Sequence, residues 1–152
     1  MRLAFFQPDI PQNLGAAIRL TACLAIPLDI IEPCAFPLND RAIGRVSLDY
    51  GGGEHVRRHD CFDAFLEAAP PSARLILLTT SGSKPHHVFA FDPEDILLMG
   101  SESAGVSPQA HAAATARVRI PMAPGQRSLN VVTAAALALG EALRQTGLWP
   151  QM

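Results

Sequence analysis

Residues 119–145 read RIPMAPGQRSLNVVTAAALALGEALRQ and contain the strongest structural signal of the chain. A short β-type run is followed by two prolines and a glycine, then by the small polar residues Ser128 and Asn130. The residues that follow have a helical pattern with no charge before Glu141. Because a helix that is apolar nearly all round has to be buried, we expect its unpaired N–H groups to face the end of the preceding strand. This arrangement predicts a polar ligand pocket, typical of an enzyme or a small-molecule binder.

The composition is that of an ordered globular protein. The chain has 152 residues, of which 49% are hydrophobic and 17% charged, and this length fits one domain with a real core. We therefore predict a single domain over residues 1–152. The low charged fraction leaves apolar surface to cover, which favours an oligomer. The net charge of −2 excludes the overall positive charge that is typical of many nucleic-acid-binding domains.

Arginine is nonetheless unusually frequent, since all but one of the 12 basic residues are arginine. Arginine suits bidentate contacts with phosphate or carboxylate. Four arginines lie close together in the sequence, interleaved with acidic residues, and they are Arg41, Arg45, Arg57 and Arg58. Two interpretations stay open for them: a solvated surface of ion pairs, or a local patch that binds RNA phosphates.

The cysteines and histidines indicate neither disulfides nor a metal. The three cysteines, Cys23, Cys34 and Cys61, lack a C-x-x-C spacing, so we expect reduced, buried thiols in a cytosolic protein. The spacing of His55, His59 and Cys61 matches no standard metal site, and we expect no metal.

The N-terminal apolar run, MRLAFF, is too short for a signal peptide. No segment approaches the length needed to span a membrane. We therefore expect a cytoplasmic protein that does not interact with a membrane.

Apolar strands alternate with helical patterns along the chain, which predicts an α/β fold with a mostly parallel sheet and helices on both faces. Asn13 is the expected N-cap of the first helix. A short helix is also expected at 41–46. The other expected strands are 3–6, 28–31, 74–79, 96–99 and 118–120, and the other expected helices are 14–24, 60–69, 110–116 and 131–145.

Ligands of such sheets collect at the carboxyl ends of the strands, where two further loops are polar. One is Thr79–Gly82, and the other is the glycine-flanked segment 100–105 around Glu102. The second loop lacks the lysine of a P-loop, and the chain has no G-x-G-x-x-G, so ATP and NAD are disfavoured. Glu102 is expected either to hold an ammonium, a ribose hydroxyl or an arginine, or to cap the helix that begins near Ser107.

Arg19 stands among apolar residues of the first expected helix. Its side chain either extends to solvent along an apolar stem or is held by an anion in a pocket, and the sequence leaves both possibilities open.

Three segments, PDIPQNLGAAIRL (8–20), LLMGSESAGVS (97–107) and VRIPMAPGQRSLNVVTAAA (118–136), resemble in order the three motifs of the SpoU-like branch of the SPOUT RNA 2′-O-methyltransferases. The short length and the segment IIEPCAFPLNDRAIGRVSLDY (30–50) are similar to the minimal subgroup that methylates the wobble nucleotide of tRNA. The resemblance covers essentially the whole chain.

This resemblance implies a deep C-terminal trefoil knot, an exception to the rule that chains do not thread their own loops. It also implies a homodimer that binds S-adenosylmethionine in the knot, releases S-adenosylhomocysteine and takes tRNA as its partner. By the same resemblance, the residues implied in catalysis are Arg19, Asn13, Glu102 and Asn130. Those implied in binding the cofactor are Leu78, Thr79, Gly100, Glu102, Gly105, Ile120, Met122, Ser128 and Leu129.

The implied activity is S-adenosylmethionine-dependent 2′-O-methylation of cytidine or uridine 34 in tRNAs with leucine-type anticodons. Val132 lacks a hydroxyl that the family often has, and Gly140 replaces a tyrosine common in the wobble subgroup. Three alternatives are a methyltransferase for another tRNA or rRNA site, a knotted dimer that binds the cofactor or RNA without turnover, and a flavodoxin-like nucleotide binder. Only the knotted fold predicts that 128–130 lies close to Glu102 and to a partner's Arg19.

Overall fold

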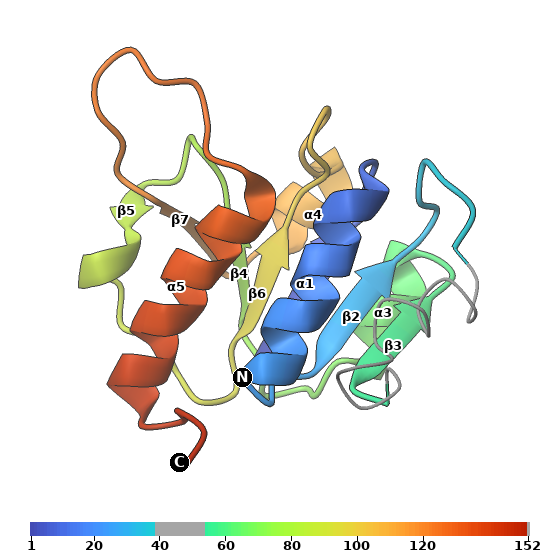
Figure 1. Ribbon diagram of the computed structural model, residues 1–152, viewed down its shortest axis with the longest axis horizontal. Coiled ribbons are helices and arrows are strands. Elements are labelled where there is room, and N and C mark those ends of the chain that lie inside the picture. The colour runs from blue at the N-terminus through green and yellow to red at the C-terminus, as the bar shows by residue number, and fades with distance from the viewer. Residues whose placement is uncertain (39–53, 152) are drawn as a thin grey trace.

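A computed structural model describes residues 1–38 and 54–151. These residues contain a seven-stranded sheet in the order β3-β2-β1-β6-β4-β7-β5 (Figure 1). Every pair of neighbouring strands is parallel, which confirms the predicted parallel α/β architecture. The strands are β1 (Arg2–Phe6), β2 (Leu28–Ile31), β3 (Val56–His59), β4 (Leu75–Leu78), β5 (Lys84–Pro85), β6 (Ile96–Met99) and β7 (Ala116–Arg119).

Helices cover both faces of the sheet, as expected. Two helices, α1 (Pro11–Cys23) and α5 (Val131–Thr146), lie side by side on one face (Figure 1). The helices α3 (Phe62–Ala68) and α4 (Pro108–Ala113) pack on the other. A short 3-10 helix, η1 (His86–Val88), contacts α5. Since the sheet has both faces covered, its central strands β2, β4 and β6 are fully buried.

Several predicted boundaries are wrong by a few residues. The first helix begins at Pro11, and its N-cap is Ile10, which makes no side-chain capping bond. Proline suits the first helical position because that position needs no N–H donor. Asn13 therefore lies inside the first turn, and its side chain is available for other contacts. Similarly, α4 begins at Pro108 behind the cap Ser107, and β7 begins at Ala116, inside the segment predicted as helical. The short helix expected at 41–46 lies outside the described residues.

The apolar helix α5 is only half buried in a single chain, contrary to expectation. One stripe faces the core, and its members are Ala135, Ala138, Leu139, Ala142 and Leu143. Leu137, on the opposite side, is 45% exposed. The difference arises because the sheet and α1 cover only one side of this helix.

The cysteines also differ from expectation. All three are free thiols, but Cys23 and Cys61 are exposed and only Cys34 is half-buried. Burial raises the pKa of the Cys34 thiol to about 11. Cys23 ends α1 and Cys61 precedes α3, so both stand at helix ends, where the surface is open.

One ionic cluster is buried between the sheet and α3. Asp29 on β2 is 1% exposed, and its carboxylate accepts two hydrogen bonds from Arg2, at 2.6 and 2.8 Å. His59 on β3 contacts the same carboxylate at 2.7 Å, and the ring of His59 packs edge-on against Phe65. The cluster ties three adjacent strands together.

We predict that Asp29→Ala lowers the free energy of unfolding by about 3–5 kcal/mol, because it leaves the half-buried Arg2 side chain without its counter-ion. The measurement is urea denaturation followed by circular dichroism. As a control, Arg144→Ala breaks the exposed pair with Glu141 and should leave the free energy of unfolding nearly unchanged. Equal losses in the two variants would contradict a special role of the buried cluster.

Candidate functional site

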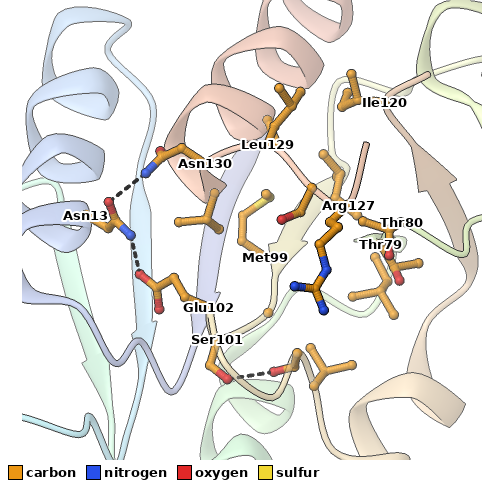
Figure 2. A pocket seen from close by; sticks show the side chains of 18 of the residues that line it. Asn13, Thr79, Thr80, Met99, Ser101, Glu102, Ile120, Arg127, Leu129 and Asn130 are labelled. Atoms are coloured by element: carbon orange, nitrogen blue, oxygen red, sulfur yellow. Dashed lines mark hydrogen bonds between the residues drawn. The ribbon is translucent and has the colours of Figure 1, made fainter. Parts of the chain in front are cut away.

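A cavity of about 520 Å³ opens where four strands end. The parallel register aligns Leu78 and Met99 at the ends of β4 and β6 with Phe5, the next-to-last residue of β1, and Val118 of β7 pairs with Leu78. The loops that follow these strands therefore meet at one edge of the sheet, as expected for parallel sheets. The volume lies in the range of small-molecule sites, and Figure 2 shows the lining side chains.

All nine residues implied in cofactor binding line this cavity. They come from three loops that are far apart in the sequence, and they are Leu78, Thr79, Gly100, Glu102, Gly105, Ile120, Met122, Ser128 and Leu129. Asn13 and Asn130 line it as well. The three sequence motifs are thus brought to one place, while the roles of the individual residues stay predictions.

A chain of hydrogen bonds joins the three motifs (Figure 2). The Asn13 amide nitrogen donates to Glu102 Oε1 at 2.7 Å, and the Asn130 amide nitrogen donates to Asn13 Oδ1 at 2.9 Å. The alternative in which Glu102 caps α4 is wrong, because the Ser107 hydroxyl accepts the capping bond from the Ala110 N–H. Asn13 is thus a bridge between the second and third motifs.

Asn130 also caps α5. Its Oδ1 atom accepts hydrogen bonds from the N–H groups of Val132 at 2.9 Å and Thr133 at 3.3 Å. The expectation that the first-turn N–H groups of this helix face a ligand is therefore wrong for these two groups, which the cap satisfies. The cap instead fixes the Asn130 amide nitrogen toward Asn13.

The glycine-flanked loop after β6 closes on itself. Ser101 N–H donates to Gly105 O at 2.8 Å, and Gly105 N–H donates to Ser101 O at 3.0 Å. A side chain at Gly100 would place its Cβ atom 2.8 Å from the Cα atom of Gly105, and Gly105 has a positive φ of 71°. Because these N–H groups are paired within the loop, they do not form a phosphate cradle, in agreement with the exclusion of a P-loop.

Sequence reasoning missed one charged residue of the cavity, Arg127. Its guanidinium points into the cavity, toward the loop that carries Ser101 (Figure 2). Arg127 lies in the segment that carried the strongest signal, but the sequence does not show which way the long loop 120–130 turns. The other lining residues not singled out are Ile10, Leu77, Thr80, Met99, Ser101, Val106, Val131 and Ala134.

Arg19 is exposed on α1 and is not among the residues that line the cavity. Helical geometry explains this position, because Arg19 follows Asn13 by six residues, or about 600° of rotation. Arg19 therefore lies about 240° around the helix from Asn13, and only Asn13 faces the cavity of its own chain.

The four arginines considered for RNA binding are only partly described. Arg41 and Arg45 lie outside the described residues. Arg57 and Arg58 are exposed on β3, an edge strand of the sheet. Arg58 forms an ion pair with Glu32 at 2.8 Å and donates to the carbonyl of Leu38, which fits the ion-paired interpretation for this residue.

The two histidines considered as metal ligands each contact a different part of the protein. His55 contacts the carbonyl of Ile18 at 3.1 Å, while His59 is engaged with Asp29. Among residues 1–38 and 54–151, no three His, Cys, Asp or Glu side chains gather in a group that could hold a metal ion. Within the same residues, no helix is both long and apolar enough to cross a membrane.

Known proteins share this sequence and fold. A sequence model of the SpoU rRNA Methylase family matches residues 1–140. A protein of Beijerinckia indica subsp. indica named tRNA (cytidine(34)-2′-O)-methyltransferase is 53% identical over 95% of this chain and 91% of its own length.

Two solved structures extend the comparison. One, described as "Structural insights into the 2-OH methylation of C/U34 on tRNA", has a TM-score of 0.86 and 39% identity, and the alignment covers 95% of this chain and 94% of the other. The SpoU methyltransferase AviRb of Streptomyces viridochromogenes, solved with the cofactor AdoMet, has a TM-score of 0.82 and 26% identity over 95% of this chain and 60% of its own. These matches contradict the flavodoxin-like alternative. The chain belongs to the SpoU rRNA methylase family.

Proposed function

We propose that this chain is an S-adenosylmethionine-dependent tRNA 2′-O-ribose methyltransferase that acts on cytidine or uridine 34, and that residues 1–152 form its single methyltransferase domain. The observation that carries the proposal is the cavity at which Asn13, Glu102 and Asn130 meet. The family assignment and the names of the relatives support the reaction class and the position in tRNA. A tRNA substrate supports a cytoplasmic location, which is part of this proposal.

The lining of the cavity fits S-adenosylmethionine. Leu78, Met99 and Ile120 provide an apolar wall for a flat base, and the glycine loop, in which Gly100 packs against the backbone of Gly105, lines the cavity beside it. Glu102 and Arg127 provide opposite charges for the ammonium and the carboxylate of an amino-acid tail. When bound, S-adenosylmethionine supplies an activated methyl group.

The residues of the chain contribute positioning, which accounts for a large share of the acceleration in group transfer. Asn13 and Asn130 hold Glu102 and the start of α5 in a fixed arrangement. Arg19 is proposed to orient the ribose 2′-hydroxyl or a neighbouring phosphate. Because a guanidinium stays protonated in proteins, Arg19 donates hydrogen bonds in this proposal, and a phosphate helps to accept the proton of the hydroxyl.

A homodimer is part of the proposal. Three large apolar side chains are exposed on or just after α5, namely Leu137, Leu148 and Trp149, the last at 50%. Exposed apolar surface of this kind favours association. Since Arg19 does not line the cavity of its own chain, a second copy that brings its Arg19 to this cavity would complete the site.

The proposed trefoil knot has support in contacts of the C-terminal segment. The end of α5 packs against the segment between β4 and β6, where Gln145 donates to Phe89 O at 2.9 Å and accepts from Phe91 N–H at 2.9 Å. An added Cβ atom at Gly82 would lie 2.5 Å from the backbone of Val118. The segment between β4 and β6 thus contacts both β7 and α5, which the proposed threading of α5 through the knot would require.

A non-catalytic binding dimer and a methyltransferase for another RNA site are the competing functions. Val132 motivates the binding dimer, because it lacks the hydroxyl often found in the family. In the structure, however, Val132 contributes its backbone N–H, which donates a hydrogen bond to Asn130 Oδ1. The missing hydroxyl therefore does not disturb the cap.

We predict that purified protein, incubated with unmodified total tRNA and labelled S-adenosylmethionine, produces 2′-O-methylcytidine or 2′-O-methyluridine at position 34. Mass spectrometry of nuclease digests maps the product. Product at other positions only would favour another RNA site, and binding of S-adenosylmethionine with no RNA product would favour the binding dimer.

Arg19→Ala is predicted to lower turnover by roughly 100-fold or more, the scale seen when a preorganised donor to a reacting oxygen is removed. The affinity for S-adenosylmethionine should stay unchanged, because Arg19 does not line the cavity of its own chain. Arg117→Ala is the matched control, because the Arg117 side chain lies on β7 and donates hydrogen bonds to His111 of α4. Near-normal turnover in Arg19→Ala would remove this residue from the mechanism.

The dimer predicts complementation between two inactive variants. If Arg19 acts across the interface, a co-expressed mixture of Arg19→Ala and Glu102→Gln chains contains heterodimers with one intact site. Random pairing makes about half of the dimers mixed, so the mixture should regain about one quarter of wild-type turnover. No recovery in a mixture shown by mass spectrometry to contain heterodimers would place Arg19 and Glu102 in the same subunit's site.

A further inference from the structure

Asp9, between β1 and α1, makes a reciprocal set of hydrogen bonds with the loop after β6. The Asp9 N–H donates to Glu102 Oε2 at 3.0 Å. In return, the Asp9 carboxylate accepts from Glu102 N–H at 3.2 Å, from Ser103 N–H at 3.1 Å and from the Ser103 hydroxyl. The backbone of one segment thus binds the side chain of the other in both directions.

These bonds determine how Glu102 faces the cavity. Its Oε2 atom is held by Asp9 N–H and its Oε1 atom by Asn13, so both oxygens are bound by one short stretch of chain. The Asp9 carboxylate meanwhile holds the backbone N–H of Glu102 itself. Asp9 is therefore the group that attaches the glycine-flanked loop to the start of α1.

We propose that Asp9 is a positioning residue of the methyl-donor site, which holds the Glu102 carboxylate in its binding orientation without contacting the donor itself. This inference rests on the proposed function of the cavity. Asp9 is not among the residues that line the cavity, whereas Glu102 is, so any effect of Asp9 on the donor must pass through Glu102 and its loop.

The charge of Asp9 is needed for this role. Hydrogen bonding with Glu102, and then with Ser103, lowers the pKa of the Asp9 carboxyl below its ordinary value, so the group is ionised at neutral pH and only accepts hydrogen bonds. Its Oδ1 atom accepts one donor and its Oδ2 atom two. An asparagine would turn an NH₂ group toward at least one of these donors, because an amide has a single acceptor oxygen.

The test is a double-mutant cycle on the full chain, with calorimetric titration of S-adenosylmethionine. Asp9→Asn should weaken binding roughly 10-fold, as expected for loss of charge-assisted hydrogen bonds that orient a binding group. Adding Asp9→Asn to Glu102→Gln should weaken binding less than it does in the wild type, because both act through the same carboxylate. Asp63→Asn is the matched control, since Asp63 also accepts a side-chain hydrogen bond, from Gln109 at 2.6 Å, away from the cavity.

The possible results distinguish a failure of the proposed role of Asp9 from a failure of the proposed methyltransferase function. Unchanged affinity in a folded Asp9→Asn protein, or full additivity with Glu102→Gln, would overturn the role of Asp9 while leaving the proposed function intact. Failure of the wild-type protein to bind S-adenosylmethionine would overturn the proposed function instead.

A milder variant covers the case in which Asp9→Asn does not fold. Ser103→Ala removes only the hydroxyl bond to Asp9. It should raise the pKa of Asp9 in a carboxyl-carbon NMR titration and weaken binding by a few-fold. An unchanged affinity in this variant, despite a raised pKa of Asp9, would show that the contact does not position Glu102.

Discussion

The arrangement of the site depends on parallel pairing in register. Met99 and Leu78 end β6 and β4 at the same level of the sheet, and Phe5, the next-to-last residue of β1, pairs with Met99, so their loops have to emerge together. Parallel strands require long crossover connections, and α1, α3 and α4 lie in such connections, whereas α5 follows the last strand. A slip of one residue in any of these pairs would move its loop and turn its side chains to the other face. The cavity is therefore a consequence of the sheet.

Backbone hydrogen bonds join the strands, whereas hydrogen bonds of polar side chains join the loops at the edge of the sheet. Asn13 contacts both Glu102 and Asn130, which are 89 and 117 residues away. Asp9 adds the reciprocal bonds to the same loop, and Asn130 passes the constraint on to the first turn of α5. Such a network is stable only when its members are satisfied. This explains why small polar residues stand here at the ends of buried apolar strands.

Much of the fold and of the cavity lining could be predicted from the sequence. The predictions that failed did so for reasons that the structure identifies. Strand and helix alternation gave the α/β class, because periodicity reports burial directly. The nine residues for which the motif resemblance implies cofactor binding all line the cavity, and their role in binding stays a prediction. The N-cap role of Asn13 was wrong because Pro11 begins the helix two residues earlier. Arg127 was missed because its direction depends on the path of an irregular loop, and Asp9 because its partners are remote in sequence.

Local residue order is sufficient for the buried strands β1, β2, β4 and β6, for the presence of the long helices and for the glycines of the tight loop, since each of these follows from propensity, burial and sterics within a few residues. The packing of these elements against one another decides which way the side chains between them point and which surfaces stay exposed. It turns Asn13 into a bridge, directs Arg127 into the cavity, places Arg19 on the far side of α1 and leaves one side of α5 uncovered. These features depend on contacts between distant segments, whose geometry is set by the sheet register and by the rotation of each helix.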